Sequence, residues 1–340
     1  MQIVEKIYNI AVNQSPEISL KYQRYRRKVS GAGRIRAWFY LIRLNIQYHV
    51  FKRKLAGCYI QDEFYENKKL NSKTSESAEQ KRDTTKELVK KLAQYDVISF
   101  DVFDTLIFRP FSEPSDLFHM VGQKLEYMDF ARIRMEMEEK CRNKKNKSQG
   151  SREVTFEDIW TMMEEETGIP KEIGMKTEWE CEKTYCFGNP YMLEVVKGLQ
   201  KLGKKMLVIS DMYLGEKYIQ ELLKSCGYPE FSSYFVSCDY KESKSQGKLY
   251  DIVKQKTGGK LTYIHVGDNQ ESDVKQAKQH QFDTNYYPNV NALGRKYRAE
   301  DMSAIIGSMY RGLVDAHLHC GLTFYSKEYE FGFVYGGLFV

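Results

Sequence analysis

Short apolar runs that end in a small or polar residue recur along the chain after position 96. The runs are VISFD from Val97, the start of VISFDVF, KMLVIS from Lys205, YFVS from Tyr234 and TYIHVG from Thr262. Their length and their β-branched and aromatic residues are typical of strands buried on both faces. Helical periodicity near 215–226, 246–257 and 272–280 separates the later runs. Strands alternating with helices predict a Rossmann-like α/β fold, a parallel sheet with helices on both faces.

A long helical insertion separates the first predicted strand from the second. Helical patterns cover 116–126, 130–142, 155–167 and 171–184. Thr155 is followed by Glu157 and Asp158, which suits a helix N-terminus because the side chains cap it and complement its dipole. We therefore expect a helical cap at 111–195, inserted into an α/β core formed by 85–110 and 196–295.

The segment before the core is basic and has helical periodicity. Residues 1–61 hold twelve basic and two acidic residues, and none of 18–61 is acidic. Apolar residues recur there at mostly helical spacing from Trp38 to Val50, which predicts a basic amphipathic helical segment. Residues 62–84 are polar and read as a linker. Residues 296–340 form a further helical and aromatic extension.

Composition restricts the class of protein. The 340 residues include 42% hydrophobic ones and carry a net charge of +6. No apolar run is long enough to predict a transmembrane helix, and the seven cysteines form no CxxC pair. We expect a cytoplasmic protein, peripheral at the inner face of the membrane if the basic segment binds lipid.

Polar side chains lie where the predicted strands end, and a parallel sheet brings such positions to one edge. They are Asp101, Ser210, the nearby Lys244, Asp268 and Asp273. A nucleophilic carboxylate that receives a phosphoryl group needs a metal, a hydroxyl to hold the phosphoryl oxygens and a cation to orient the partners. This set provides residues of each type.

In these motifs the chain resembles the haloacid dehalogenase-like (HAD) hydrolase superfamily. The resemblance covers about 97–290 and rests on FDVFDTL at Asp101, SDMYL at Ser210, KSQGKLY at Lys244 and GDNQESDV at Asp268. It implies that Asp101 is the nucleophile, that Lys244 orients it, and that Thr105, Ser210 and Asp211 contact the substrate, although for Asp211 we prefer the interpretation as a cap of the next helix. It also implies Mg²⁺, held by Asp101, the Phe103 carbonyl and Asp268, with Asp273 supporting it through water.

One position departs from the superfamily's phosphatases, which usually carry a second aspartate two residues after the nucleophile. Phe103 stands there, and Asp104 follows. On an extended segment neighbouring side chains point in opposite directions, so Asp104 is expected to point away from the site. A phosphatase for good leaving groups, a phosphatase that uses another acid or Asp104 in a bent loop, a dehalogenase and a non-catalytic binding module all remain open. Retention of Asp268 favours magnesium and phosphate.

Partners are suggested by resemblance and charge. The signatures are most similar to those of hydrolases found with bacterial surface-polysaccharide glycosyltransferases, which implies a small phosphorylated substrate, such as a sugar phosphate. Residues 20–55 could bind a membrane or a glycosyltransferase, or simply pack on the core, and no nucleic-acid motif accompanies them. We interpret Lys140–Lys147 as a solvated loop, and His317 and His319 as an ordinary pair rather than metal ligands.

Overall fold

The computed structural model describes residues 9–13, 15–27, 33–52, 82–258, 260–294, 304–322, 329–330 and 332–333. The chain divides into two compact units. The helical unit contains the described part of Met1–Gln80 together with Leu117–Met137 and Trp160–Glu178. The sheet unit contains the described part of Lys81–Asp116, Glu138–Ile159 and Trp179–Val340. The expected linker lies outside the described residues except at 82–84, and the expected domain boundaries remain predictions.

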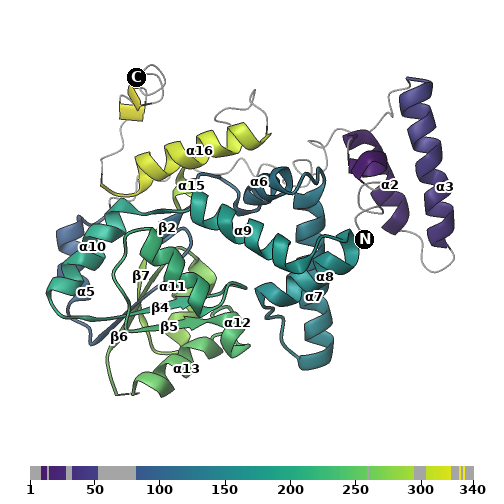
Figure 1. Ribbon diagram of the computed structural model, residues 1–340. Coiled ribbons are helices and arrows are strands. Elements are labelled where there is room, and N and C mark those ends of the chain that lie inside the picture. The colour runs from purple at the N-terminus through teal and green to yellow at the C-terminus, as the bar shows by residue number, and fades with distance from the viewer. Residues whose placement is uncertain are drawn as a thin grey trace. The chain divides into compact units, whose positions relative to one another are not determined.

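The sheet unit is built on a parallel five-stranded sheet with the order β5-β4-β1-β6-β7 (Figure 1). Its strands are β1 (Val97–Phe100), β4 (Lys205–Ser210), β5 (Ser233–Val236), β6 (Tyr263–Gly267) and β7 (Asp283–Tyr286). Four of them are the predicted strands. The edge strand β7 was not predicted, and neither was the antiparallel pair β2 (Ile107–Phe108) and β3 (Phe187–Gly188). Their short, partly polar sequences lack the apolar run on which the prediction depended.

Helices cover the sheet because both of its faces are apolar. Leu207 and Ile209 of β4 pack with Leu249 and Val253 of α13 in one buried cluster. The alternate residues of β1 and β4 are equally buried, as expected for a parallel sheet between two helical layers. The helices and helical turns of the sheet unit, apart from those described below, are α5 (Thr85–Leu92), η3 (Pro114–Asp116), α10 (Pro190–Lys201), α11 (Glu216–Ser225), α12 (Ser237–Tyr240), α13 (Lys248–Thr257), η4 (Gln270–Gln276), α14 (Ala277–Gln279), α15 (Val290–Leu293) and α16 (Ala304–His319).

Four helices form the predicted insertion between β1 and β4. They are α6 (Leu117–Lys124), α7 (Phe130–Gln149), α8 (Phe156–Thr167) and α9 (Lys171–Tyr185). A reciprocal cap starts α8: the Asp158 amide donates to Thr155 Oγ1 and the Thr155 amide to Asp158 Oδ2, each at 3.1 Å. The loop interpretation of Lys140–Lys147 is wrong, because α7 continues through it and Lys145 pairs with Asp158 at 2.9 Å.

The described part of the basic N-terminal segment is helical. Its elements are η1 (Asn9–Asn13), α2 (Pro16–Arg27), α3 (Gly33–Asn45) and η2 (Ile46–Val50). One side of α3 is buried through Ala37, Leu41 and Leu44, which pack with Ile18 and Tyr22 of α2. The segment therefore has a small apolar core of its own.

Elsewhere in the helical unit a buried carboxylate joins three of the inserted helices. Glu178 of α9 accepts two hydrogen bonds from Arg134 of α7, from Nε and from a terminal nitrogen, each at 2.9 Å. Trp160 Nε1 of α8 donates to the same carboxylate at 2.9 Å. Arg134 and Glu178 are almost wholly buried. The charge pair is thus fully enclosed and depends on its partners for compensation.

The remaining features are membrane-spanning helices and the two histidines near the end of the chain. Within the described ranges, no helix is both long and apolar enough to cross a membrane. His317 and His319 lie in α16, where His317 Nε2 is 2.7 Å from the Tyr329 hydroxyl. The aromatic tail from 325 lies mostly outside the described residues.

Candidate active site

The predicted site residues meet at the carboxyl edge of the sheet. Phe100 at the end of β1 pairs with Val208 of β4 and Val266 of β6, so Asp101 emerges between the ends of these strands. The Asp101 amide donates to the Val266 carbonyl at 2.9 Å. Asp101, Asp268 and Asp273 each offer a carboxylate oxygen within 4.8 Å of the others, as a divalent-cation site requires. In the described part of the chain no other group of three metal-ligating side chains is found.

Lys244 connects two of these acids. Its Nζ is 2.5 Å from Asp101 Oδ1 and 2.7 Å from Asp273 Oδ1, and all three side chains are largely buried. Asp211 holds the backbone of the lysine in place, since its carboxylate accepts the Lys244 amide at 2.7 Å and the Ser245 amide at 3.1 Å. The cap interpretation of Asp211 is wrong: Asp239 accepts the Glu216 amide at the start of α11 instead.

The charges of the site influence one another strongly. Burial raises the pKa of Asp101 well above its usual value, Lys244 opposes this, and the neighbouring acids add to it. Burial, Asp104 and Asp273 raise the pKa of Asp268 to about 6, although its hydrogen bond with Asn289 opposes the shift. Burial would lower the pKa of Lys244, but Asp101 and Asp273 hold it well above its usual value. Without a bound cation, the site therefore contains three carboxyl groups and only one ammonium group to compensate for their negative charge.

Asp273 differs from the other two acids because protein groups already surround its carboxylate. Oδ1 contacts Lys244 Nζ and lies 3.3 Å from His265 Nε2, while Oδ2 accepts the Asn269 amide at 3.0 Å. His265 is buried in β6, and its Nδ1 is 2.9 Å from Ser99 Oγ. Gly267 permits this approach, since a Cβ atom there would overlap the Asp273 carboxylate. Asp273 is thus placed to hold Lys244 in position.

The two predicted hydroxyl groups lie at this edge. Ser210 ends β4 and is buried. Thr105 lies in the turn after β1, where its carbonyl accepts Asn189 Nδ2 at 2.7 Å. Its buried Oγ1 has no hydrogen-bond partner among the described residues. The contacts of both hydroxyl groups with a substrate remain predictions.

The segment after Asp101 is bent, so the alternation argument for Asp104 is wrong. Asp104 has φ 59°, a left-handed conformation that aspartate tolerates better than most residues. Its amide donates to the Ile107 carbonyl at 2.8 Å. Burial raises the pKa of its carboxyl, and nearby Arg109 and a hydrogen bond with Asn289 oppose the shift. Asp104 therefore lies beside Asp268, at the site and not away from it.

Phe103 stands where an acid would be expected, and its ring packs against an arginine. The Arg109 guanidinium lies 4.1 Å from the centre of the Phe103 ring. The same guanidinium makes a two-point ion pair with Glu182, through Nε at 3.1 Å and a terminal nitrogen at 2.7 Å. Arg109 was not predicted, because only the turn after β1 brings its side chain back over Phe103.

Asn289 is a second residue that the sequence analysis missed. Its Oδ1 accepts the Asn291 and Ala292 amides at the start of α15, at 2.9 and 3.2 Å. This fixes the orientation of the amide, so that Nδ2 donates to Asp268 Oδ2 at 2.8 Å. Asp104 hydrogen-bonds with the same side chain. The helix-cap role is visible in the sequence as Asn after Pro288, whereas the contact with two acids depends on β7 pairing beside β6.

The raised pKa of Asp268 leads to a stability prediction for Asp268→Asn. Because the folded-state pKa of about 6 exceeds the ordinary value of 3.8 for an aspartate in the unfolded chain, the ionised carboxyl destabilises the metal-free fold above pH 6 and not below about pH 4. We expect metal-free Asp268→Asn to exceed the parent in unfolding free energy by about 1–3 kcal/mol at pH 8, and to match it near pH 4. Urea unfolding in EDTA at both pH values measures this. A variant less stable than its parent at pH 8 would contradict it.

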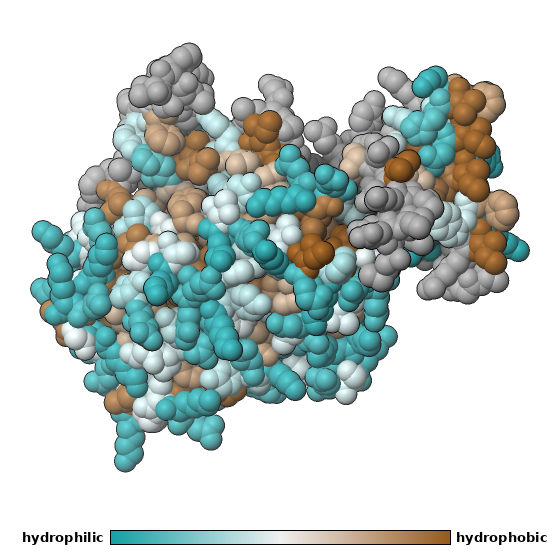
Figure 2. Space-filling model, in the orientation of Figure 1, coloured by the Kyte–Doolittle hydropathy of each residue, from teal (hydrophilic) through white to brown (hydrophobic). Residues whose placement is uncertain are grey.

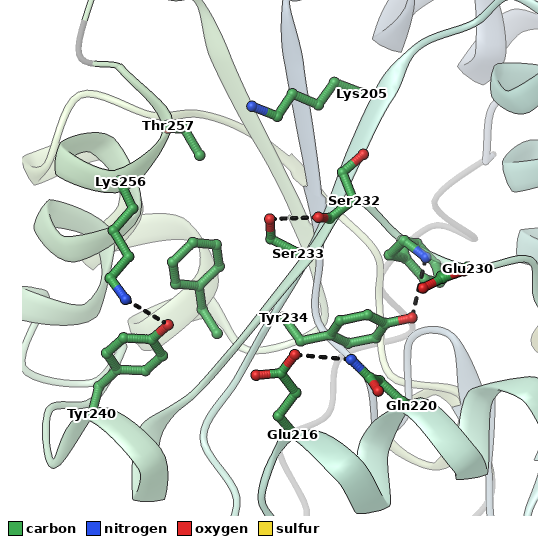
Figure 3. A pocket seen from close by; sticks show the side chains of 12 residues that line it. Lys205, Glu216, Gln220, Glu230, Ser232, Ser233, Tyr234, Tyr240, Lys256 and Thr257 are labelled. Carbon is green, nitrogen blue, oxygen red and sulfur yellow. Dashed lines mark hydrogen bonds between the residues drawn. The ribbon is translucent and has the colours of Figure 1, made fainter.

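A polar pocket lies away from these residues, along the edge strand β5 (Figure 3). Its charged and polar side chains pair with one another: Gln220 Nε2 donates to Glu216 Oε1 at 2.8 Å, and Lys256 Nζ to the Tyr240 hydroxyl at 3.3 Å. None of the predicted site residues lines it. The pocket therefore adds nothing to the candidate chemistry.

Comparisons with known proteins find remote likenesses only in solved structures. No protein-family model matches the sequence, and no curated protein matches it. One similar structure is an L-2-haloacid dehalogenase from Xanthobacter autotrophicus, with 14% identity over 64% of this chain and 88% of that chain and a TM-score of 0.42. Another is a HAD family enzyme from Bacteroides thetaiotaomicron in complex with magnesium and inorganic phosphate, with 12% identity over 57% of this chain and 95% of that chain and a TM-score of 0.41.

Proposed function

We propose that the chain is a magnesium-dependent phosphohydrolase of the HAD type that acts through Asp101. The carrying observation is the position of Lys244 Nζ, within 2.7 Å of both Asp101 and Asp273, beside three clustered carboxylates. The four motifs in superfamily order support the proposal independently. The proposed substrate is a small phosphorylated metabolite, such as a sugar phosphate in surface-polysaccharide synthesis in the cytoplasm.

The side chains fit a divalent cation. Asp101 and Asp268 have raised pKa values because burial and neighbouring acids disfavour their charge, and a bound cation would compensate for it. Asp101, Asp268 and the Phe103 carbonyl would hold Mg²⁺, with Asp273 acting through water. When bound, Mg²⁺ would neutralise the oxygens of a substrate phosphate.

Each protein group then has one role in the reaction. The Asp101 carboxylate attacks phosphorus while the bond to the leaving oxygen breaks, and water later hydrolyses the aspartyl-phosphate. Lys244 orients the nucleophile and is itself held by Asp273 and the carboxylate of Asp211. The Ser210 hydroxyl, at the end of the neighbouring strand β4, would donate to a phosphoryl oxygen.

Because Phe103 stands where an acid would be expected, the reaction rate should depend on whether the leaving group needs a proton. No carboxyl stands at the usual position of the acid, and the ring there lies under Arg109. We infer that acyl and aryl phosphates react faster than alkyl phosphates, since the latter need a proton on the departing oxygen. The same feature favours a second candidate function, a non-catalytic module that keeps the fold and the phosphate pocket.

The test measures phosphate release from acetyl phosphate, an aryl phosphate and an alkyl phosphate, with Mg²⁺ or with EDTA. Release that depends on Mg²⁺ and is fastest from the first two substrates is expected. No release from any of them, by protein that binds Mg²⁺ and is folded, would overturn the phosphohydrolase and leave the binding module.

Asn289 allows a separate test of the metal site. Asn289→Ala and Asn289→Ser both remove the amide donor to Asp268, but serine can still cap α15. We expect both to weaken Mg²⁺ binding about tenfold or more, as is usual when a partner of a ligand is lost. Only Asn289→Ala should also lose about 1 kcal/mol of unfolding free energy. Mg²⁺ titration by calorimetry and urea unfolding measure the two effects, and unchanged Mg²⁺ affinity in the serine variant would exclude this role.

A further inference from the structure

The α3–η2 segment of the helical unit has an exposed apolar stripe opposite its buried side. The stripe consists of Ile35, Trp38, Phe39, Ile42, Ile46, Val50 and Phe51, each between 42% and 69% exposed. Figure 2 shows hydrophobic residues along one side of α3. With 3.6 residues per turn, the five positions from 35 to 46 fall within about 100° of the helix circumference. Ala37, Leu41 and Leu44 occupy the opposite side.

Basic residues lie along one edge of this stripe. Residues 33–52 include four arginines and lysines and no acidic residue. Exposed Arg36 and Arg43 both lie about 80–100° from Ile35 around the helix, between the stripe and the buried side. A contiguous apolar surface with a basic border suits one kind of partner, an apolar layer below a negatively charged surface.

We propose that the stripe is a docking surface for an anionic lipid bilayer. The helix would lie in the plane of the interface with the stripe among the acyl chains and Arg36 and Arg43 at the headgroups. Trp38 suits this depth because indole favours the boundary between hydrocarbon and water. A protein partner would need a groove that is both apolar and acidic, whereas an anionic bilayer offers both properties at once.

The test uses the full chain and two kinds of vesicle, pure phosphatidylcholine and a mixture with phosphatidylglycerol. The expected result is cosedimentation with the anionic vesicles that weakens with salt, together with a blue shift of tryptophan emission that is absent from Trp38→Phe. The double variant Phe39→Ser/Ile42→Ser should lower the partition coefficient about tenfold or more, because two large apolar side chains leave the bilayer. Arg36→Gln/Arg43→Gln should lower it on anionic vesicles alone.

The matched control is Ile173→Ser/Leu202→Ser, which removes two residues of similar exposure, 54% and 57%, from α9 and the end of α10. It should bind vesicles as the parent does, and circular dichroism establishes that every variant is folded. Absence of sedimentation with anionic vesicles, or equal loss in the control, would overturn the proposal. So would a parent dimer that Phe39→Ser/Ile42→Ser converts to a monomer without any vesicle binding, since the occupant would then be a second copy of the chain.

Discussion

Asp101→Asn is expected to lower kcat for every phosphate ester at least about 10³-fold, because the amide keeps the size of the side chain but is not a nucleophile. The substitution should keep the contact with Lys244 and the position of residue 101 at the end of β1. Measurement of kcat for acetyl phosphate with saturating Mg²⁺ gives the effect directly.

The control for this substitution is Asp283→Asn. It makes the same chemical change at an exposed residue that starts β7, at the opposite end of the strand from the site. Its kcat should equal that of the parent. If Asp101→Asn retained more than about a tenth of the activity while its fold was intact, phosphoryl transfer to Asp101 would be excluded.

The second large effect concerns stability. Glu178→Ala should lower the unfolding free energy of the helical unit by about 3–5 kcal/mol, because it leaves the buried Arg134 charge without its counterion. It also removes the acceptor of Trp160 Nε1, so three helices lose a common contact. Urea unfolding followed by tryptophan fluorescence reports this unit through Trp160.

Two further variants identify the cause. Glu165→Ala makes the same truncation at an exposed position of α8 and should change the free energy by less than about 0.5 kcal/mol. Arg134→Met/Glu178→Met removes both charges and should recover most of the loss, since apolar replacement of a complete buried pair is often tolerated. A Glu178→Ala variant as stable as Glu165→Ala would show that the pair contributes little.

Local pattern was sufficient for the elements that have a strong apolar signal. The parallel strands β1, β4, β5 and β6 and the helices α6, α8 and α9 were predicted close to their observed bounds, whereas α7 continues to Gln149, beyond its predicted end at 142. The motif residues Asp101, Lys244, Asp268 and Asp273 were predicted as neighbours, because parallel strands bring their carboxyl ends to one edge. That inference requires only the order of elements along the chain.

Backbone conformation and long-range contacts could not be predicted from the sequence and were found only in the structure. Asp104 was expected to point away, but a left-handed φ places it beside Asp268, and the sequence does not distinguish an extended segment from a turn there. Asn289 and Arg109 reach the site from segments whose own patterns indicate only a helix cap and a loop. Contacts with residues distant in the sequence depend on which segments lie side by side in the fold. This is a property of the tertiary structure and not of the local sequence.

The same distinction holds for the rest of the chain. From the sequence alone, the residues before position 61 are basic, apolar at helical spacing and almost without acids, and Glu178 is one acid among many in α9. Only the tertiary structure decides which side of α3 packs on α2 and which side stays exposed, and which glutamate is buried against an arginine. Helical periodicity follows from local backbone geometry, whereas burial depends on the surfaces that other parts of the chain provide.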